Sequence, residues 1–162
     1  MRTWRLSADV DTDQLAPGHA MRHGGLDVIA RHCLEAVRPE FAREVRRGDV
    51  IVAGAGFGIG SSREQAASVL AHLGVAAVIA PSFGGLYFRN AFNVGLLLLT
   101  CAQADAITDG EALTFDARAG RITLADGRQL TIDPIPGFLL ERVEAGGLLP
   151  ELKRRFQTKE SP

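Results

Sequence analysis

The chain has 162 residues, of which 46% are hydrophobic and 23% are charged, a size and composition that suit one domain with one hydrophobic core. Its 18 basic and 19 acidic residues leave a net charge of -1, and the basic residues are scattered, which argues against a nucleic-acid or polyanion surface. Two cysteines, Cys33 and Cys101, exclude a multi-bridge disulfide scaffold and cannot by themselves complete a four-ligand zinc or iron–sulfur site. The sequence has neither a signal-peptide pattern nor an apolar run long enough to span a bilayer, so we expect a reduced, cytoplasmic protein.

The first 25 residues show no sustained hydrophobic period. Asp9, Asp11 and Asp13 are followed by Pro17 and several glycines, which indicates a loop after a short first strand. Loops of this composition often carry functional groups. This segment is therefore a candidate part of the functional site.

Helices and buried strands alternate after this loop. Apolar residues at helical spacing predict a helix from residue 26 to 33 or 34 and another over 39–45. Apolar, β-branched runs at 50–53 and 75–80 are typical of strands buried on both faces, and a helical pattern over 61–73 lies between them. Strand, helix and strand form a βαβ unit with parallel strands and a right-handed crossover, so the fold class is α/β.

The second half adds further helices and antiparallel strands. We expect a helix over 83–93, a buried strand over 94–99, two alternating runs within 112–132, and helices over 137–145 and 148–156. The polar last six residues, 157–162, are expected to be frayed.

The strongest functional signal is the loop GAGFGIGSSRE, residues 54–64, which follows a buried strand. Its four alternate glycines leave the backbone bare and allow positive φ, so an anion can approach the peptide N–H groups. The next helix adds unpaired N–H donors and the positive end of its dipole. Arg63 contributes a carboxylate-binding fork beside the hydroxyls of Ser61 and Ser62.

A plain helix start is the alternative interpretation of the same residues. Ser61 as N-cap and Glu64 three residues later match a capping box. A cap needs only one hydroxyl, however, whereas two serines and Arg63 follow a long glycine-rich approach. We therefore prefer a ligand site.

Other common sites do not match this sequence. The glycine loop has no lysine for a P-loop, and its glycine spacing differs from the dinucleotide-binding pattern. Four histidines, His19, His23, His32 and His72, lie at no recognisable ligand spacing, so no metal site is predicted.

Several separated motifs together resemble the small subunits of 3-isopropylmalate dehydratases and the swivel domains of aconitases. The resemblance covers about residues 9–149, and the order of its motifs makes it specific. The motifs are DVDTDQLAPG at 9–18, GDVIVAG..FG.GSSRE.A at 48–66, VIAPSF at 78–83 and FRNAFNVGL at 88–96.

The resemblance implies a three-layer β/β/α swivelling domain, with residues 1–162 forming a single domain. Such a domain is active only with a large subunit that carries a four-iron, four-sulfur cluster. This chain would supply no ligand to the cluster and bind no metal or cofactor of its own. In the family the cluster binds the substrate hydroxyl and a carboxylate as a Lewis acid.

The resemblance also implies roles for the residues of the glycine loop. Ser61 would remove the proton next to a substrate carboxylate, and a serine can do so only where its alkoxide is stabilised by N–H donors. Arg63 would clamp a carboxylate, with Ser62 and Gly60 binding substrate beside it. Asp13 matches the aspartate of the family's DTD motif and would orient the substrate or the partner's groups, whereas Asp11 and Thr12 are equally explained as turn formers.

A second segment matches the family's specificity loop. Residues 20–23 align with the Tyr-Leu-Arg-Thr of one branch, which places Arg22 on the arginine position. Arg22 would grip a distal carboxylate, and a solvent-exposed loop arginine is the alternative.

Three departures leave the substrate open. Ile59 stands where the family generally has cysteine, Gln65 where it has histidine, and Gly84-Gly85 where Ala-Arg is usual. The leading expectation is a small subunit that isomerises 2- and 3-isopropylmalate in leucine biosynthesis. The alternatives are a paralogous subunit for a methylmalate, dimethylmalate, homocitrate or citrate type of acid, or a non-catalytic binding module of the same fold. We expect the isolated chain to be capable of self-association, and we expect no nucleic-acid or membrane partner.

Overall fold

The computed structural model describes residues 1–22 and 24–157, so His23 and residues 158–162 of the expected frayed tail lie outside the described part. Its centre is a four-stranded sheet in which all neighbours are parallel. In spatial order the strands are β1 (Thr3–Arg5), β2 (Val50–Val52), β3 (Ala77–Ala80) and β4 (Leu97–Thr100).

The central strands are buried on both faces, as their sequences predict. Every residue of β2 and β3 is buried, because helices and the second sheet cover both sides of the parallel sheet. Ile51 pairs with Trp4 of β1 and with Val78 of β3. The predicted βαβ unit is therefore confirmed, with its second strand beginning at Ala77 instead of residue 75.

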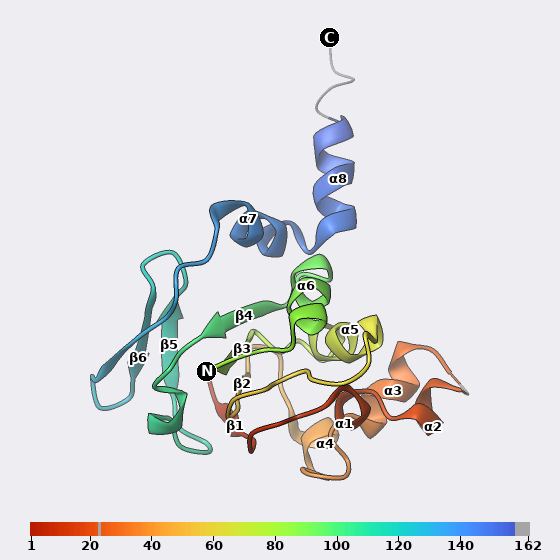
Figure 1. Cartoon of the computed structure of the whole chain (residues 1–162), viewed down its shortest axis with the longest axis horizontal. Helices are drawn as coiled ribbons and strands as arrows, with labels where there is room; N and C mark the ends of the chain where they lie inside the picture. The colour runs from red at the N-terminus through yellow and green to blue at the C-terminus, as the bar shows by residue number, and fades with distance from the viewer. Residues whose placement is uncertain (23, 158–162) are drawn as a thin grey trace.

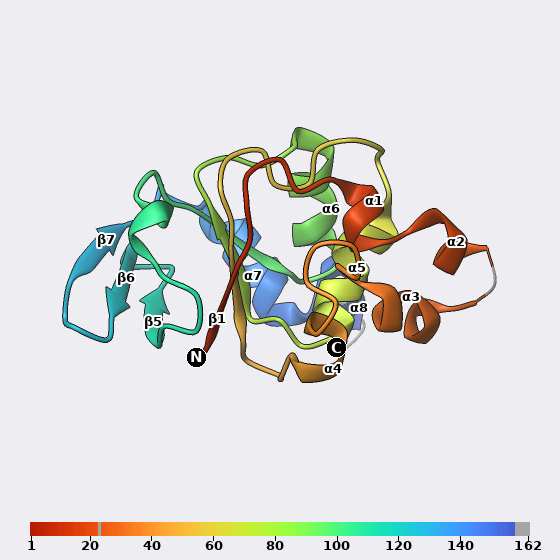
Figure 2. The same ribbon diagram turned by 90° about the horizontal axis from the view of Figure 1, so that it is seen from below.

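A separate antiparallel sheet follows in the chain. It contains β5 (Leu113–Asp116), β6 (Arg121–Leu124) and β7 (Gln129–Thr131), in that order. The two alternating runs expected here thus form three strands. The bridge between Arg2 and Ala112 ties this sheet to the start of β1. Figures 1 and 2 both show it at one end of the molecule, with the parallel sheet in the middle and α2 and α3 at the other end.

The helices complete the three-layer β/β/α order that the resemblance implies. Two one-turn helices, α1 and α2, lie in the first segment, which was expected to be mostly loop. The described α-helices are α1 (Thr12–Leu15), α2 (Gly18–Met21), α3 (Leu26–His32), α4 (Phe41–Glu44), α5 (Glu64–His72), α6 (Gly85–Asn93), α7 (Gly137–Ala145) and α8 (Leu148–Gln157), and a 3-10 turn spans Ala104–Ala106. None of the described helices is long and apolar enough to cross a membrane.

The two C-terminal helices occur where the sequence predicts them. Gly146 ends α7 in the left-handed conformation, with φ of 88°, the usual glycine stop of a helix. The next helix, α8, stands away from the body in Figure 1. Its buried Glu151 accepts a hydrogen bond from Arg142 Nε at 2.8 Å, which fixes the base of α8 to α7.

Candidate functional site

Three loops meet at the carboxyl edge of the parallel sheet. They comprise residues 6–11 after β1, residues 53–63 after β2 and residues 81–84 after β3. Ligands of open α/β sheets bind at this edge, because the loops that leave neighbouring parallel strands converge there. The glycine-rich motif and the aspartate motif of the sequence are thus brought to one place.

The first of these loops, residues 6–11, forms hydrogen bonds directly with the glycine loop, residues 53–63. Gly58 N–H donates a hydrogen bond to the Val10 carbonyl at 2.7 Å, and Thr12 N–H donates to the Ile59 carbonyl at 3.0 Å. A parallel bridge joins Asp11 to Ile59. These bonds hold the start of α1 against the residues that precede Ser61.

The third loop, residues 81–84, forms hydrogen bonds with the other side of the glycine loop. Phe57 N–H donates to the Ser82 carbonyl at 3.1 Å, and Gly84 N–H donates to the Phe57 carbonyl at 2.8 Å. The Ser82 hydroxyl accepts a hydrogen bond from Gly56 N–H at 2.9 Å. The glycine loop is therefore bonded on both sides, and its shape is set before any ligand arrives.

Two glycines of this loop have no substitute. Gly58 has φ of +77°, and a Cβ there would lie 2.1 Å from the ring of the buried Tyr87. Gly60 has φ of +98°, and its Cβ would lie 3.3 Å from Thr12 Oγ1. The expected positive φ is confirmed at both positions. Close packing excludes a side chain at Gly58, and the left-handed backbone disfavours one at Gly60.

The capping-box interpretation is wrong. Helix α5 begins at Glu64 and its N-cap is Arg63, which has extended backbone angles and makes no side-chain cap. The predicted helix over 61–73 therefore starts three residues late, because Arg63 still has extended backbone angles. Ser61 and Ser62 are exposed in the loop and their hydroxyls are not used by the helix.

Arg63 and Asp13 form an ion pair across the site. Arg63 Nη1 donates to Asp13 Oδ1 and also to the Ala16 carbonyl at 3.2 Å. Within the described residues, Nε and Nη2 of Arg63 have no hydrogen-bond partner. Nε and one Nη are the two parallel donors that bind a carboxylate in the bidentate mode.

Asp11 has the turn-forming role that was one of its two expected explanations. Its Oδ1 accepts a hydrogen bond from Gln14 N–H at 2.9 Å, and its own N–H donates to Gln14 Oε1 at 3.2 Å. This reciprocal pair is a capping box for α1. Asp11 thereby fixes the helix that presents Asp13.

Thr12, which the sequence explains only as a turn former, lies buried at the candidate site. It is only 1% exposed, yet its hydroxyl has no hydrogen-bond partner among the described residues. The hydroxyl lies beside Gly60, directly under the loop that carries Ser61. A buried polar group without a partner costs stability, so this one requires a reason. The aspartates on either side were the only visible signal.

The structure does not bring Arg22 to these loops. Arg22 follows α2, is exposed, and makes no hydrogen bond or ion pair with any described residue. Figure 2 shows α2 at the end of the molecule, beyond α1 and α5. The other residues expected in the site, Gly60, Ser61, Ser62, Arg63 and Asp13, lie together.

The departures from the family pattern lie close to the same surface. Ile59 is 38% exposed beside the serines, and Gln65 is exposed in the first turn of α5. A Cβ at Gly84 would lie 2.4 Å from the Gly58 carbonyl oxygen. Gly84 is therefore explained by the close approach of two loops.

Neither cysteine fits a ligand of an iron–sulfur cluster. Cys33 and Cys101 are free and fully buried. Burial raises the pKa of each thiol above its ordinary value, so both stay protonated, whereas cluster ligands are thiolates. Among the described residues, the site consists of hydroxyl, guanidinium, carboxylate and peptide groups.

Comparisons with known proteins agree with this fold. Residues 35–104 match the Aconitase C-terminal domain family. The chain is 44% identical over 158 residues to a methanogen homoaconitase small subunit from Methanothermobacter thermautotrophicus, covering 97% of this chain and 92% of the relative. It is 44% identical over 149 residues to 3-isopropylmalate dehydratase small subunit 1 from Archaeoglobus fulgidus, and the match covers 91% of this chain and 92% of that relative.

A solved structure matches over almost the whole chain. The crystal structure of 3-isopropylmalate dehydratase from Methanocaldococcus jannaschii has a TM-score of 0.91 and 37% identity, covering 99% of this chain and 97% of that one. The chain therefore belongs to the family of 3-isopropylmalate dehydratase and homoaconitase small subunits. This confirms the resemblance and the α/β swivel fold expected from the sequence.

Proposed function

We propose that this chain is the small subunit of a heteromeric aconitase-type hydro-lyase that isomerises 2- and 3-isopropylmalate by dehydration and rehydration. Relatives named as 3-isopropylmalate dehydratase small subunits support this assignment. The observation that carries it is the juxtaposition of two exposed serines, free of any capping role, with Arg63, whose Nε and Nη2 are unpaired among the described residues. A hydroxyl beside a free carboxylate-binding edge suits proton removal next to a carboxylate.

Ser61 is the base in this proposal. Its alkoxide takes the proton from the carbon adjacent to a substrate carboxylate, and peptide N–H groups near the start of α5 stabilise the alkoxide. Arg63 holds that carboxylate through Nε and Nη2, while Ser62 and the peptide at Gly60 complete the contact. Asp13 keeps Arg63 in position by occupying Nη1.

The site is open, which suits a subunit that contributes half of an active site. Gly60, Ser61 and Ser62 are all exposed. A large subunit would close over them and hold the four-iron, four-sulfur cluster. When bound there, the cluster supplies Lewis-acid activation of the substrate hydroxyl. We further propose that the chain moves as one swivelling domain, and that it works in the cytoplasm in leucine biosynthesis.

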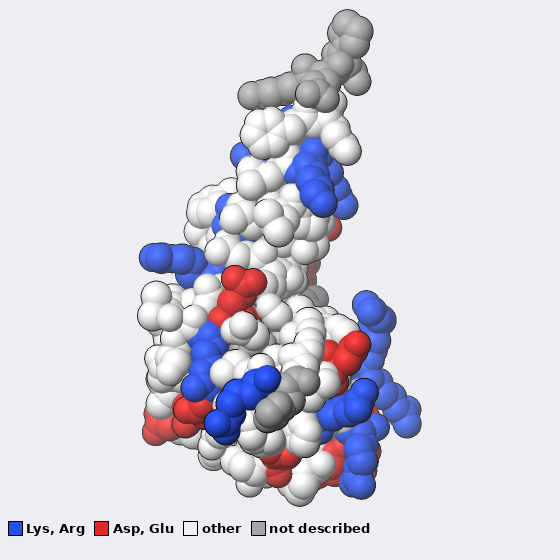
Figure 3. Space-filling view, turned by 90° about the vertical axis from the view of Figure 1, so that its right-hand side faces the viewer, with Lys and Arg blue, Asp and Glu red and all other residues white. Residues whose placement is uncertain are grey.

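A homoaconitase-type subunit is the second candidate. The relative named as a methanogen homoaconitase small subunit favours it. Arg22 lies away from the three loops, but it is exposed and has no partner among the described residues. Figure 3 looks onto the α2–α3 end of the molecule, where Lys and Arg side chains are spread over the surface. A third carboxylate, present in homocitrate-type acids and absent from isopropylmalate, would give Arg22 a counter-charge.

Reconstitution with the large subunit tests the reaction. The chain, its anaerobically prepared large subunit and isopropylmalate should give turnover, and Ser61→Ala should lower kcat at least about 100-fold without preventing assembly. Thr131→Ala, which removes an exposed hydroxyl from β7, is the matched control and should be silent. Full activity of Ser61→Ala would remove Ser61 as the base. Assembly without turnover of any acid would leave the binding module as the function.

A substrate panel separates the two candidates. If isopropylmalate is the substrate, Arg22→Gln should leave its kcat/KM close to wild type. If a homocitrate-type acid is preferred, Arg22→Gln should lower kcat/KM for that acid about 100-fold. Arg31→Gln, at another exposed arginine of the same end, controls for net charge.

A further inference from the structure

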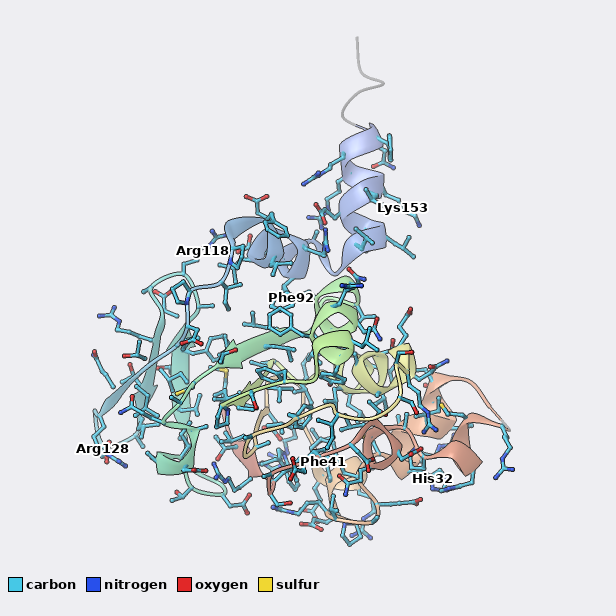
Figure 4. The ribbon with its side chains drawn as sticks, viewed as in Figure 1. His32, Phe41, Phe92, Arg118, Arg128 and Lys153 are labelled. Atoms are coloured by element: carbon cyan, nitrogen blue, oxygen red, sulfur yellow. The ribbon has the colours of Figure 1, made fainter. Side chains whose placement is uncertain are left out.

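We propose that His19, His32 and Glu35 form a binding site for a divalent transition-metal ion of the zinc class, separate from the hydro-lyase site. One ligand atom from each residue can be chosen so that all three lie within 4.8 Å of one another. The sequence spacing of the histidines predicts no metal site, whereas the fold brings His19, His32 and Glu35 close together. Figure 4 labels His32 at the α2–α3 end of the molecule, opposite Arg128 in the turn between β6 and β7.

Both imidazoles point a nitrogen at the same carboxylate. His32 Nδ1 lies 2.7 Å from Glu35 Oε2, and His19 Nε2 lies 3.1 Å from Glu35 Oε1. The two rings meet edge to face with their centroids 5.0 Å apart. In a tetrahedral zinc site, ligand atoms about 2.0 to 2.1 Å from the metal lie about 3.4 Å from each other. Small side-chain rotations therefore suffice to admit the ion between the three groups.

The backbone holds two of the three ligands in a fixed relation. His32 is the last residue of α3, and Glu35 N–H donates to its carbonyl at 3.2 Å. Between them Leu34 is fully buried with φ of +60°, a conformation that non-glycine residues rarely adopt. Leu34 N–H donates to the Gln14 carbonyl at 2.8 Å, which anchors the turn. The turn directs Glu35 back toward His32.

The ligand chemistry selects the class of ion. Two imidazoles and one carboxylate match the His₂Glu set that binds zinc, and they also suit cobalt, nickel or copper. Magnesium and calcium prefer sites made of oxygen ligands. The side chains of His19, His32 and Glu35 are 54%, 39% and 39% exposed, so an ion can enter and keep a water as its fourth ligand.

An ion bound at this site would link α2 to the end of α3. His19 belongs to α2, and the other two ligands lie at and just after the end of α3. The connection between these helices carries Arg22, so occupancy of the site would restrict the segment that holds the candidate specificity arginine. The metal proposal itself stands on the three ligands and does not depend on the proposed hydro-lyase activity.

Metal titration of the isolated full chain, free of any histidine tag and pre-treated with chelator, tests the site. Competition of the chain with a chromophoric zinc chelator should give one Zn²⁺ per chain, unaffected by millimolar Mg²⁺. His19→Gln, His32→Gln and Glu35→Gln should each weaken binding about 100-fold, since even loss of an outer-shell partner costs 10- to 100-fold. His72→Gln is the matched control, because His72 pairs with Asp27 at 2.9 Å in a histidine–carboxylate pair that belongs to no described three-ligand cluster.

Hydrogen exchange supplies a readout that is independent of affinity. Zn²⁺ should slow amide exchange in α2 and at the end of α3 in the wild type and in His72→Gln, and leave both unchanged in Glu35→Gln. Circular dichroism checks that each variant is folded. If a histidine variant does not fold, Glu35→Gln still tests the site, because it keeps the volume of the side chain. Stoichiometric binding that survives Glu35→Gln, equal loss in His72→Gln, or no binding below millimolar Zn²⁺ would each overturn the proposal.

Discussion

Asp13 and Arg63, which are 50 residues apart, form an ion pair that joins α1 to the N-cap of α5. Arg63 is the more buried partner, with 24% of its side chain exposed against 63% for Asp13. Because Asp13 and the Ala16 carbonyl both take Nη1, the opposite edge of the guanidinium has no partner among the described residues. The pair therefore orients Arg63 while leaving a bidentate donor edge for a ligand.

Asp13 should act through Arg63. In the reconstituted complex, Arg63→Ala should lower kcat/KM about 100- to 1,000-fold, because it removes a charged contact to the substrate. Asp13→Asn should cost about tenfold, the lower end of what loss of a positioning partner costs. The double variant should be no worse than Arg63→Ala alone, since neighbouring groups that work as a unit are not additive. Steady-state kinetics of the three variants gives the coupling free energy between Asp13 and Arg63.

Glu64→Gln is the control for this cycle. Glu64 is exposed and adjacent to Arg63 in sequence, so the variant changes local charge without removing the ion pair. Its kcat/KM should stay within about twofold of wild type. Fully additive losses in the double variant would show that Asp13 contacts substrate by itself.

Gly58 should be intolerant of any side chain. Gly58→Ala places a Cβ at positive φ and 2.1 Å from the Tyr87 ring, so either the loop or the ring must move. The left-handed backbone and the overpacking together should lower the free energy of unfolding by about 2–4 kcal/mol, measured by urea denaturation. Gly85→Ala is the control, because a Cβ there meets open space at the start of α6. A stability loss as large for Gly85→Ala would contradict the steric explanation.

Much of the fold could be predicted from local pattern. Buried β-branched runs gave β2 and β3, and a glycine stop gave the end of α7 at Ala145. The one-turn helices α1 and α2 could not be predicted, because four residues carry too little periodicity and depend on a cap such as Asp11.

The residues of the candidate site were proposed from the sequence, whereas much of their geometry could not be predicted from it. Positive φ followed from the glycine spacing, but the start of α5 did not, since Ser61 and Glu64 match a capping box that the extended backbone rules out. Two contacts depend on tertiary packing and cannot be predicted from the spacing of residues in the sequence. These are the ion pair of Asp13 with Arg63 and the cluster around Glu35.

The Thr12 hydroxyl should not stabilise the isolated chain, although it can contribute to activity. Its buried hydroxyl has no partner among the described residues, so Thr12→Val should leave the free energy of unfolding unchanged or raise it by about 1 kcal/mol. If the hydroxyl serves the ligand or the loop in the closed complex, the same variant should lower kcat several-fold. Thr3→Val is the matched control, because the Thr3 hydroxyl is buried and donates to the Thr108 carbonyl at 2.8 Å. Thr3→Val should cost about 1–2 kcal/mol, and an equal loss in Thr12→Val would refute the prediction.

Asp49 should make stability depend on pH in the acid range. Its Oδ2 accepts hydrogen bonds from Trp4 Nε1 at 2.9 Å and from Arg2 Nη2 at 3.0 Å. Arg46 N–H donates to the same oxygen at 3.0 Å. Burial acts to raise the pKa of Asp49, but these hydrogen bonds and the charge of Arg2 outweigh it and hold the pKa below its ordinary value. Asp49→Asn should therefore lower the free energy of unfolding by about 2–3 kcal/mol at neutral pH.

The sign of the pH effect follows from the lowered pKa of Asp49. The unfolded chain takes up its proton first as the pH falls, so the stabilisation is complete above about pH 5 and is lost below about pH 4, through the folded-state pKa. Urea denaturation across this range should show the wild-type advantage over Asp49→Asn shrinking toward acid pH. Asp105→Asn, at a carboxylate whose side chain is 78% exposed, should follow the wild type closely. A difference between wild type and Asp49→Asn that stays constant down to about pH 2 would mean that packing, and not the ionised carboxylate, holds β1 beside β2.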